Sequence, residues 1–553
     1  MVEGDRLRYI PIGVEDFKEL RNGDYYFIDK SELISDILSD RSKVFLFTRP
    51  RRFGKSLNLS MIDAFFNMEY KGNTWFDGLR ISEHKEIDRH RNAYPVIKIC
   101  MKDIPVEDYD DFLLKIGSIV RMIYRQFPYL KENDNVSDLT EIYFDRTHLF
   151  NKVELQESLL VLCRAITTVC GVKPIVLIDE YDNPINNSFN KKDHKAILDF
   201  LRYFYSSSLK GNDSLTFAVV TGVMQIAKES IFSGLNNLSV NNIFSKESDE
   251  RYGFTPSEVE ELCAYYGHPE RFEEAKEWYD GYRFGNAEIY NPWSVLNYID
   301  NRFEPGKYWA GTSGNDIIDT LLNYADSETY EELQSLGESK TACIRFPTSI
   351  VLNDLNRDKN TIYAVMAIAG YLNAVPNGEG SYDLSIPNKE MYYVFDEVIT
   401  TRLQSYTSGA FNDFLEGMQI ADVQKVKKGL NNLFKNNIPS IILTREKDYQ
   451  LILAAMAMNR CGRYEIRLEK EAGIGRADII MKPTRPGLPN IIFELKKTAD
   501  KRKKLQKLAD AAIDQIMDKE YYWGMDGRIL MYGIAFRGKE SEVSFKEMRL
   551  HKE

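Results

Sequence analysis

The residues from Val44 to Ile62 place the strongest constraint on how this chain can fold. They begin with four apolar residues that predict a buried strand, and they end with a helical run that starts at Leu57. Between the two lies a tight loop that ends in Gly-Lys-Ser. A strand, a loop and a helix in this order bind phosphate, because backbone N–H groups at the helix N-terminus surround the anion and the lysine reaches the outer phosphates. The segment therefore predicts an α/β core that holds a nucleotide.

The loop departs at one position from the general pattern G-x-x-x-x-G-K-[ST], since Arg49 stands where the first glycine is usual. We expect Lys55 to reach the β and γ phosphates of ATP, and the Ser56 hydroxyl to ligate Mg2+. A basic turn that only leads into a helix is the alternative, and for Arg51 and Arg52 so is a contact with a neighbouring subunit. The residues of this loop that are expected to contact the nucleotide are Arg49, Arg51, Arg52, Gly54, Lys55 and Ser56.

Strand-like apolar runs alternate with amphipathic helical stretches from about residue 43 to residue 223. This alternation is typical of βα units and predicts a mostly parallel sheet. Gly and Pro residues mark the entry to the third run, and a Thr-Gly pair ends the fourth. The expected strands are Val44–Phe47, Val96–Cys100, Ile175–Ile178 and Phe217–Val220.

Two acidic residues, Asp179 and Glu180, directly follow the third expected strand. We expect the strand end to place Asp179 beside the Mg2+ that Ser56 ligates, and Glu180 to polarise water for attack on the γ-phosphate. By analogy with related ATPases, Thr221, at the end of the fourth strand, is a candidate contact to the γ-phosphate or to the attacking water. The alternatives are an acidic strand exit that caps the next helix and, for Thr221, a polar cap at a strand end.

The loop from Thr48 to Ser56 and the later run Asp179-Glu180-Tyr181-Asp182-Asn183-Pro184 resemble a predicted AAA-ATPase-like family found in many bacterial proteins. In that family, arginine replaces the first loop glycine, as it does at Arg49. The resemblance covers roughly residues 8–300 and implies a P-loop NTPase core that binds ATP with Mg2+. Further matching stretches lie at residues 26–31, 221–223 and 233–237.

Smaller modules are expected in the middle of the chain. The sequence Thr255-Pro256-Ser257-Glu258 predicts a helix start, with a threonine cap, a proline in the first turn and an acid three positions after the cap. The aromatic segments Trp278–Gly285 and Tyr290–Val295 are expected to be loops and turns. A helix that ends at Gly370, with two strands between it and Pro387, indicates a winged-helix-like module.

A second group of candidate catalytic residues lies near the C-terminus. Asp478 and the run Phe493-Glu494-Leu495-Lys496 are expected there on the paired strands of a hairpin. Because strand side chains alternate, Glu494 and Lys496 share one face, while Phe493 and Leu495 pack behind them. Carboxylates such as Asp478 and Glu494 hold Mg2+, which activates water, and a lysine orients the nucleophile or neutralises the transition state. The alternative is an ordinary amphipathic edge strand with an exposed acid–base pair.

This arrangement is similar to the PD-(D/E)XK nuclease superfamily over about residues 440–540, and to the nuclease-like domain often appended to the same ATPase family. The resemblance implies that Glu446, which opens a helix, is the helical acid of the pattern. It also implies that Gln515, with Tyr521 six residues on, matches the glutamine-tyrosine helix of some members. Over both sites, the catalytic candidates are Glu180, Asp478, Glu494, Lys496, Glu446 and Gln515. The candidate metal ligands are Ser56, Asp179, Asp478 and Glu494.

Composition and charge limit where the chain works and what it binds. No apolar run approaches the ~20 residues that span a bilayer, and the N-terminus carries no secretory signal. Six scattered cysteines without a C-x-x-C pair are typical of reduced thiols, so a cytoplasmic protein without a membrane partner is expected. The net charge of -11 argues against coating nucleic acid through bulk electrostatics. Basic clusters at residues 49–52 and 496–507 are candidates for a local groove, with a solvated helix face as the alternative for the second.

With 553 residues the chain is too long for one core, and several domains are expected. They are a P-loop NTPase core at residues 1–240, a helical lid region at 241–340, a winged-helix-like and helical connector at 341–435, and an α/β nuclease-like domain at 436–553. We expect an Mg2+-dependent ATPase whose nucleotide cycle controls a metal-dependent nuclease-like domain that acts on DNA or RNA. The alternatives are a regulatory NTP switch and a nucleic-acid-binding scaffold with an inactive nuclease fold. A homo-oligomer is left open.

Overall fold

The structure is a computed structural model of the chain. It describes residues 7–102, 104, 107–189, 191–224, 237–309, 321, 336, 341–345, 359–378, 380–395, 410–436, 446–458, 464–472, 475–484, 487–500 and 502–550, and at some helix and strand positions, such as Glu446, only the backbone. The chain forms two compact units, Met1–Tyr324 with Ser335–Val394, and Ala325–Gln334 with Phe395–Glu553. The four-domain division expected from the sequence stays a prediction.

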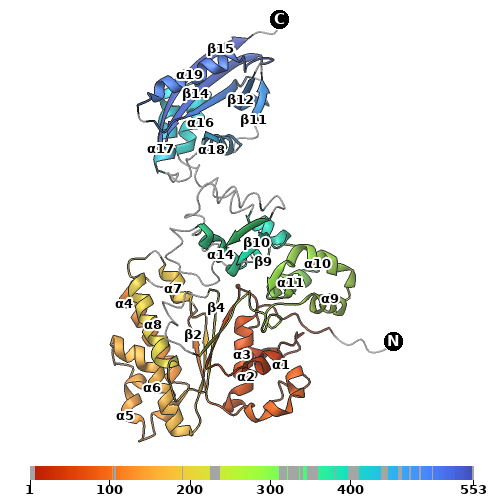
Figure 1. Ribbon diagram of the computed structural model, residues 1–553, viewed down its shortest axis with the longest axis vertical. Coiled ribbons are helices and arrows are strands. Elements are labelled where there is room, and N and C mark those ends of the chain that lie inside the picture. Colours follow the sequence, from red (N-terminus) through yellow and green to blue (C-terminus); the bar gives the residue numbers. More distant parts are fainter. Residues whose placement is uncertain are drawn as a thin grey trace. The chain divides into compact units, whose positions relative to one another are not determined.

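A five-stranded sheet forms the centre of the first unit (Figure 1). Its strand pairs are all parallel, in the order β2-β3-β4-β1-β5. Four strands confirm the sequence-based expectation to within two residues, whereas β5 is not predicted, because its Leu-Ser-Val-Asn sequence has only weak apolar character. The strands are β1 (Val44–Thr48), β2 (Val96–Cys100), β3 (Ile175–Asp179), β4 (Ala218–Gly222) and β5 (Leu238–Asn241).

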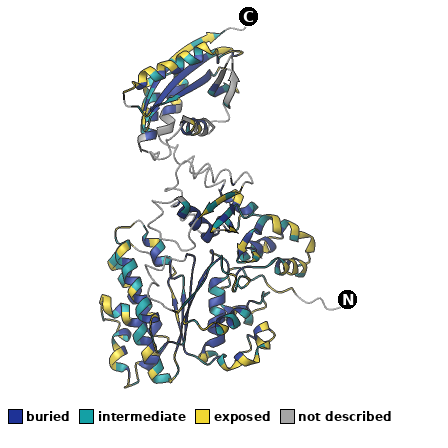
Figure 2. Ribbon diagram, in the orientation of Figure 1, coloured by how far each residue is buried: buried dark blue, intermediate teal, exposed yellow. Residues whose placement is uncertain are grey.

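Helices cover both faces of this sheet, with α1 to α3 on one face and α4 to α8 on the other (Figure 1). Burial on both faces explains why β1, β3 and β4 are apolar along most of their length, and these three strands are buried in Figure 2 as well. The helices are α1 (Phe17–Asn22), α2 (Glu32–Ser39), α3 (Lys55–Phe66), α4 (Tyr109–Tyr124), α5 (Ser137–Phe144), α6 (Lys152–Cys170), α7 (Asn183–Ser188) and α8 (His194–Leu209). Short 3-10 helices lie at Met68–Tyr70, Arg80–Glu83, Lys85–His90, Pro128–Leu130 and Pro269–Arg271.

Three helices and a small hairpin follow the sheet. The helix start predicted at Thr255 is confirmed, because its side chain and that of Glu258 form a capping box. The two aromatic segments expected to be loops are instead regular: the first holds a β-hairpin and the second begins a helix. The helix signal was present, since Asn291 caps α11 with Pro292 in its first turn. The elements are α9 (Pro256–Tyr265), α10 (Phe272–Tyr279), β6 (Tyr282–Phe284), β7 (Ala287–Ile289) and α11 (Pro292–Asp300).

The helix expected to end at Gly370 is confirmed as α14 (Lys359–Ala369), and Gly370 itself has a φ of +88°. Two strands follow it as expected, β9 (Asn373–Gly378) and β10 (Ser381–Ser385). A third strand that the sequence does not predict, β8 (Ala342–Arg345), pairs with β10 to give the antiparallel order β8-β10-β9. The winged-helix-like assignment stays a prediction.

The second unit is built on a mixed five-stranded sheet of order β11-β12-β13-β14-β15. Only β13 and β14 are parallel, and α19 lies between them in the chain as the crossover that a parallel pair requires. The expected hairpin is confirmed, with Ile479 opposite Phe493. The elements are α16 (Ala410–Ile420), α17 (Val423–Asn436), α18 (Glu446–Met458), β11 (Tyr464–Ala472), β12 (Gly475–Pro483), β13 (Asn490–Lys497), α19 (Leu505–Asp518), β14 (Gly527–Arg537) and β15 (Glu540–Leu550).

The two faces of β13 have different surroundings. Phe493 and Leu495 belong to a large core with α16, α17 and α18, while Ile492 packs on the opposite face with Ile516 of α19. Since side chains alternate along a strand, Glu494 lies on the same face as Ile492, toward α19. None of the helices in the described part of the chain has the length and apolar composition that crossing a bilayer requires.

Candidate functional site

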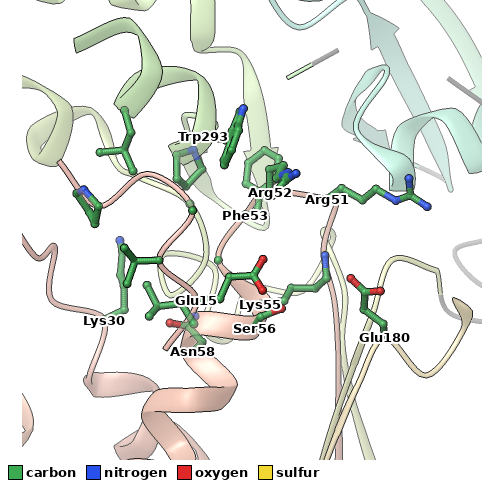
Figure 3. A pocket seen from close by; sticks show the side chains of 18 of the residues that line it. Glu15, Lys30, Arg51, Arg52, Phe53, Lys55, Ser56, Asn58, Glu180 and Trp293 are labelled. Carbon is green, nitrogen blue, oxygen red and sulfur yellow. The ribbon is translucent and has the colours of Figure 1, made fainter. Parts of the chain in front are cut away.

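A cavity of about 430 Å3 opens over the loop from Thr48 to Ser56, which we call the phosphate loop, and over the start of α3 (Figure 3). Its lining comes from this loop, from the N-terminal segment, from the residues after β3 and from the start of α11. Gly54 precedes α3 with a φ of +81°, a conformation that glycine adopts without strain. Because the first N–H groups of a helix have no partner within the helix, a cavity at this point is suited to an anion.

Lys55 is buried at the base of the cavity. Its ammonium donates hydrogen bonds to the carbonyl oxygens of Arg49, at 3.0 Å, and Pro50, at 2.8 Å. Burial lowers the pKa of Lys55 from its ordinary value, and the nearby carboxylates of Asp179 and Glu180 oppose that change. The loop therefore holds a desolvated positive charge at the start of α3. A phosphate group bound there could pair with the Lys55 ammonium.

The structure places Arg49 in the core of the fold and not in the lining of the cavity. Its guanidinium donates to the carbonyl oxygens of Thr48, at 2.9 Å, and Asn241, at 3.0 Å, and to Asn241 Oδ1 at 2.6 Å. It also lies over the rings of Tyr252, at 5.0 Å, and Phe284, at 5.1 Å. Burial lowers the pKa of Arg49 to about 10. We therefore assign Arg49 to fastening the loop to the end of β5, and correct its expected contact with the nucleotide.

The other two loop arginines do line the cavity. Arg51 is exposed, whereas the Arg52 guanidinium stacks over the Trp293 ring at 4.1 Å. Figure 3 shows this stack above the loop. Arg52 also has a φ of +70°, which is uncommon for a residue with a side chain. The two arginines thus differ, because Arg51 is accessible to a ligand while Arg52 joins the loop to α11.

The expected acidic pair lies at the end of β3. Asp179 Oδ1 accepts hydrogen bonds from the Glu180 N–H, at 3.0 Å, and from the buried Thr221 hydroxyl. Thr221 therefore orients Asp179, and neither residue is among those that line the cavity. A contact of Thr221 with the nucleotide stays a prediction.

Glu180 does line the cavity, and it departs from ordinary backbone geometry with a φ of +52°. Such a conformation in a non-glycine residue is a form of strain that gathers at functional sites. Its carboxylate accepts a hydrogen bond of 3.2 Å from the Asn183 side chain. Burial, and next the neighbouring Asp179, raise the pKa of Glu180 from its ordinary value. A carboxylate with a raised pKa, aimed into a cavity, is suited to accept a proton from water.

No motif in the sequence indicates how the segment around α11 is connected to the loop. Trp309 Nε1 donates to the carbonyl oxygen of Arg51 at 3.2 Å. The buried Glu390 carboxylate accepts from the Trp309 N–H and from the Ser294 hydroxyl, both at 2.7 Å. Burial raises the pKa of Glu390 to about 7. Glu390 therefore binds two residues of the segment 294–309, and Trp309 connects this segment to the loop.

The second unit brings together the three polar residues expected on its hairpin. Glu494 is 2% exposed, and its Oε1 accepts from the Lys496 ammonium at 2.8 Å. Asp478 Oδ2 accepts from the Leu495 N–H at 2.7 Å, which fixes Asp478 beside β13. Burial, and next the charge of Asp478, raise the pKa of Glu494 to about 7, although Lys496 opposes this change. The buried Glu494, on a central strand, does not match the alternative of an exposed acid–base pair on an edge strand.

The implied nuclease pattern has two further residues, Gln515 and Glu446, and the structure describes the side chain of Gln515 alone. Gln515 on α19 donates to the Tyr521 hydroxyl at 3.0 Å, and Tyr521 is near enough to Glu494 and Asp478 for their charges to raise its pKa, after burial. Glu446 begins α18, but its side chain lies outside what the structure describes. Its place at the site stays a prediction.

The donor atoms of both sites suit Mg2+, which prefers carboxylate, hydroxyl and phosphate oxygens. At the second site, Glu494 Oε2 is buried and accepts no hydrogen bond within the described structure, so an acceptor is left for a cation. Over the described residues, no three His, Cys, Asp or Glu side chains gather as a complete metal cage. Mg2+ is commonly held by one or two carboxylates with water and substrate oxygens completing its shell, so two carboxylates fit it.

Comparisons with known proteins agree with this geometry. A family model described as Predicted AAA-ATPase matches residues 11–232, and a model of the PD-(D/E)XK nuclease superfamily matches residues 444–546. An uncharacterised protein in the 5′ region of vnfD from Azotobacter chroococcum mcd 1 is 28% identical over 405 residues, which cover 71% of this chain and 70% of that protein.

Among solved structures, the ORC2 protein of Aeropyrum pernix, in ADPNP and ADP complexes, aligns over 70% of this chain and 93% of its own length. The identity is 11% and the TM-score is 0.21, which is too low to indicate a shared fold. The strand order, the geometry of the two sites and the family matches support the same assignment, and none of them depends on this structure. Residues 11–232 are therefore similar to the predicted AAA-ATPase family, and residues 444–546 are similar to the PD-(D/E)XK nuclease superfamily.

Proposed function

We propose that this protein is an Mg2+-dependent ATPase whose nucleotide cycle controls a metal-dependent nuclease domain acting on DNA or RNA. The observation that carries the proposal is the cavity over the phosphate loop, whose lining includes Lys55, Ser56 and Glu180. A cation, a hydroxyl and a carboxylate in one cavity are the groups that ATP hydrolysis requires. The buried carboxylate and lysine of the second unit supply the nuclease half of the proposal.

In the ATPase step, the phosphates lie against the start of α3, where Lys55 neutralises their charge. Ser56 and Asp179 are the residues that would hold Mg2+, which supplies further charge neutralisation when bound. Glu180 orients a water molecule toward the γ-phosphate and accepts its proton, since its raised pKa makes the carboxylate a stronger base. Thr221 keeps Asp179 in place through its hydroxyl.

In the nuclease step, Asp478 and Glu494 would hold Mg2+, which activates water and polarises the phosphodiester. The Lys496 ammonium lies 2.8 Å from Glu494 Oε1, so it accompanies the carboxylates at the site and neutralises charge that develops on the phosphate. Gln515 of α19 donates to the hydroxyl of Tyr521, which follows the helix and lies near Glu494 and Asp478. The exposed basic residues after β13 favour a nucleic-acid substrate, because they can pair with its backbone. They are Lys503, Lys504 and Lys507.

The link between the two halves rests on their presence in one chain. Two further parts of the proposal, a cytoplasmic location and assembly into a homo-oligomer, rest on the sequence alone. ATP in the first unit changes the rate at which the second unit cuts, and loss of the phosphate grip removes that effect.

The ATPase assignment is tested by phosphate release from wild type and from the variants Lys55→Ala and Glu180→Gln, with Glu157→Gln, an exposed acid on α6, as matched control. Wild type and the control should turn over ATP. We expect Lys55→Ala to lose binding, and Glu180→Gln to bind ATP while turnover falls roughly 100-fold or more. Tight ATP binding without turnover in wild type would contradict the ATPase and favour the regulatory switch.

A further inference from the structure

Lys102 lines the same cavity, although it matches no motif of the sequence. It follows β2, and the Met101 N–H before it donates to the Asp179 carbonyl oxygen at 3.0 Å. β2 is paired in parallel with β3, so that Cys100 lies opposite Asp179. Lys102 is therefore held at the carboxyl edge of the sheet, one strand away from the acidic pair.

The charge of Lys102 reaches the residue that we assign as the base. Lys55, Lys102 and Glu180 all line the same cavity. Glu180 is thus within electrostatic range of Lys55 and of Lys102. A phosphate group placed between Lys55 and Glu180 would be within range of Lys102 as well.

Most other cations in the lining are engaged in close contacts. Lys30 pairs with Glu258 at 2.6 Å, and Arg251 pairs with Asp36 at 3.0 Å. Lys55 is bonded to the loop and Arg52 to Trp293, as described above. Lys102 has only a long ion pair in the described structure, 3.8 Å from Glu15 Oε2, with both side chains about half exposed. Such an exposed pair contributes little free energy, roughly 0 to 1 kcal/mol, and is easily exchanged for another anion.

Glu15 also lines the cavity, and Figure 3 shows its carboxylate pointing into it between Lys30 and Lys55. A carboxylate in this position opposes the approach of a triphosphate, because both groups are negative. It attracts Lys102 for the same reason that a phosphate would. Glu15 therefore acts as a stand-in anion for the nucleotide at this side of the cavity.

We propose that Lys102 is a second phosphate-binding cation of the nucleotide site, and that Glu15 holds it until the terminal phosphate takes the place of the carboxylate. The inference rests on the proposed ATPase function and adds a residue to it. In the bound state, Lys102 pairs with the γ-phosphate and neutralises charge there during transfer to water. ADP lacks that phosphate, so Lys102 favours ATP over ADP.

The test compares equilibrium binding of ATP and of ADP, with kcat and KM for ATP, in full-length wild type, Lys102→Ala, Lys102→Arg and Glu15→Gln. Lys131→Ala, an exposed lysine distant in sequence, is the control. We expect Lys102→Ala to lose about 10-fold in ATP affinity with little change for ADP, and about 10-fold or more in kcat. Lys102→Arg should keep most of the ATP affinity and most of kcat. Glu15→Gln should bind ATP severalfold more tightly than wild type.

Equal loss of ATP and ADP affinity in Lys102→Ala would overturn the inference, as would ATP binding and turnover like those of wild type. A Glu15→Gln variant that binds ATP more weakly would overturn the part played by Glu15. Failure of the proposed function is distinguishable, because wild type would then either bind ATP without turning it over or bind ATP no better than Lys55→Ala. Normal ATPase activity with an unaffected Lys102→Ala would instead overturn the inference alone.

Discussion

The indole Nε1 of Trp309 donates a hydrogen bond of 3.2 Å to the carbonyl oxygen of Arg51, in the middle of the phosphate loop. The Trp309 N–H is in turn bound by the buried Glu390. The loop proposed to bind phosphate is therefore held from outside the sheet by residues more than 250 positions away in the chain. A change in the conformation of the loop on nucleotide binding would alter the hydrogen bonds of Trp309 and Glu390.

Replacing Trp309 with Phe keeps an aromatic ring beside Tyr371 but removes the donor to the Arg51 carbonyl. We expect ATP affinity to fall severalfold while the protein stays folded, because one net hydrogen bond of about 1 kcal/mol positions the loop. Fluorescence titration with a labelled ATP analogue measures the affinity, and circular dichroism checks the fold. Trp523→Phe is the control, since Trp523 is 73% exposed in the second unit. Unchanged affinity would mean that the contact does not position the loop.

Glu390 predicts a pH dependence of stability. Burial raises its pKa to about 7 in the folded protein from an ordinary value of 4.5, so the folded state binds more protons than the unfolded state between these values. The free energy of unfolding should therefore fall as pH rises from about 4.5 to about 7, by up to ~3 kcal/mol from this group. Urea unfolding of the first unit at several pH values measures it. In Glu390→Gln this part of the slope should vanish, and an identical slope would contradict the assignment.

Arg49 should matter for stability and not for phosphate binding. Arg49→Ala removes a buried guanidinium and leaves Asn241 Oδ1 without this donor, so we expect roughly 3 to 5 kcal/mol less stability. Urea denaturation measures the loss. Arg51→Ala, at an exposed position of the same loop, should cost little stability but weaken ATP binding. The opposite pattern, with Arg49→Ala stable and deficient in binding, would restore Arg49 to the nucleotide site.

The carboxylates of the second unit should bind Mg2+ without nucleotide. Glu494 Oε2 is the buried acceptor left for the cation, so Glu494→Gln should abolish the heat of Mg2+ binding and the rise in melting temperature that Mg2+ causes. Calorimetric titration of the full chain measures the heat, and thermal unfolding with and without Mg2+ measures the change in melting temperature. Asp518→Asn, an exposed acid at the end of α19, should behave like wild type. Equal Mg2+ binding by Glu494→Gln would place the ion elsewhere.

Local sequence was sufficient to predict those elements whose residue pattern lies within one strand or one turn. Val44–Phe47 and Ile175–Ile178 are apolar throughout because both faces of the central sheet are covered, and Gly54 marks the start of α3. The structure at Asn291-Pro292 could not be predicted from these two residues, since the same pair begins both turns and helices. In the folded protein the pair begins α11. Local propensity does not settle such cases.

The parts of the site that depend on distant contacts were not predictable. Lys102, Glu15 and Trp309 reach the cavity or the loop from separate segments, and no spacing within the sequence links them. Lys102 had one usable signal, because it follows an expected strand at the edge where ligands of parallel sheets bind. Arg49 looked like a phosphate contact because of its place in the motif, and only its buried partners identify its structural part.

The most direct test of the account is Mg2+-dependent cleavage of single-stranded and plasmid DNA, with and without ATP, by wild type, Lys55→Ala and Glu494→Ala. We predict that wild type cuts at a rate that ATP changes, that Lys55→Ala cuts at a rate that ATP does not change, and that Glu494→Ala does not cut. Cleavage by Glu494→Ala at the wild-type rate would contradict the nuclease site. An ATP effect that survives in Lys55→Ala would contradict control through the phosphate loop.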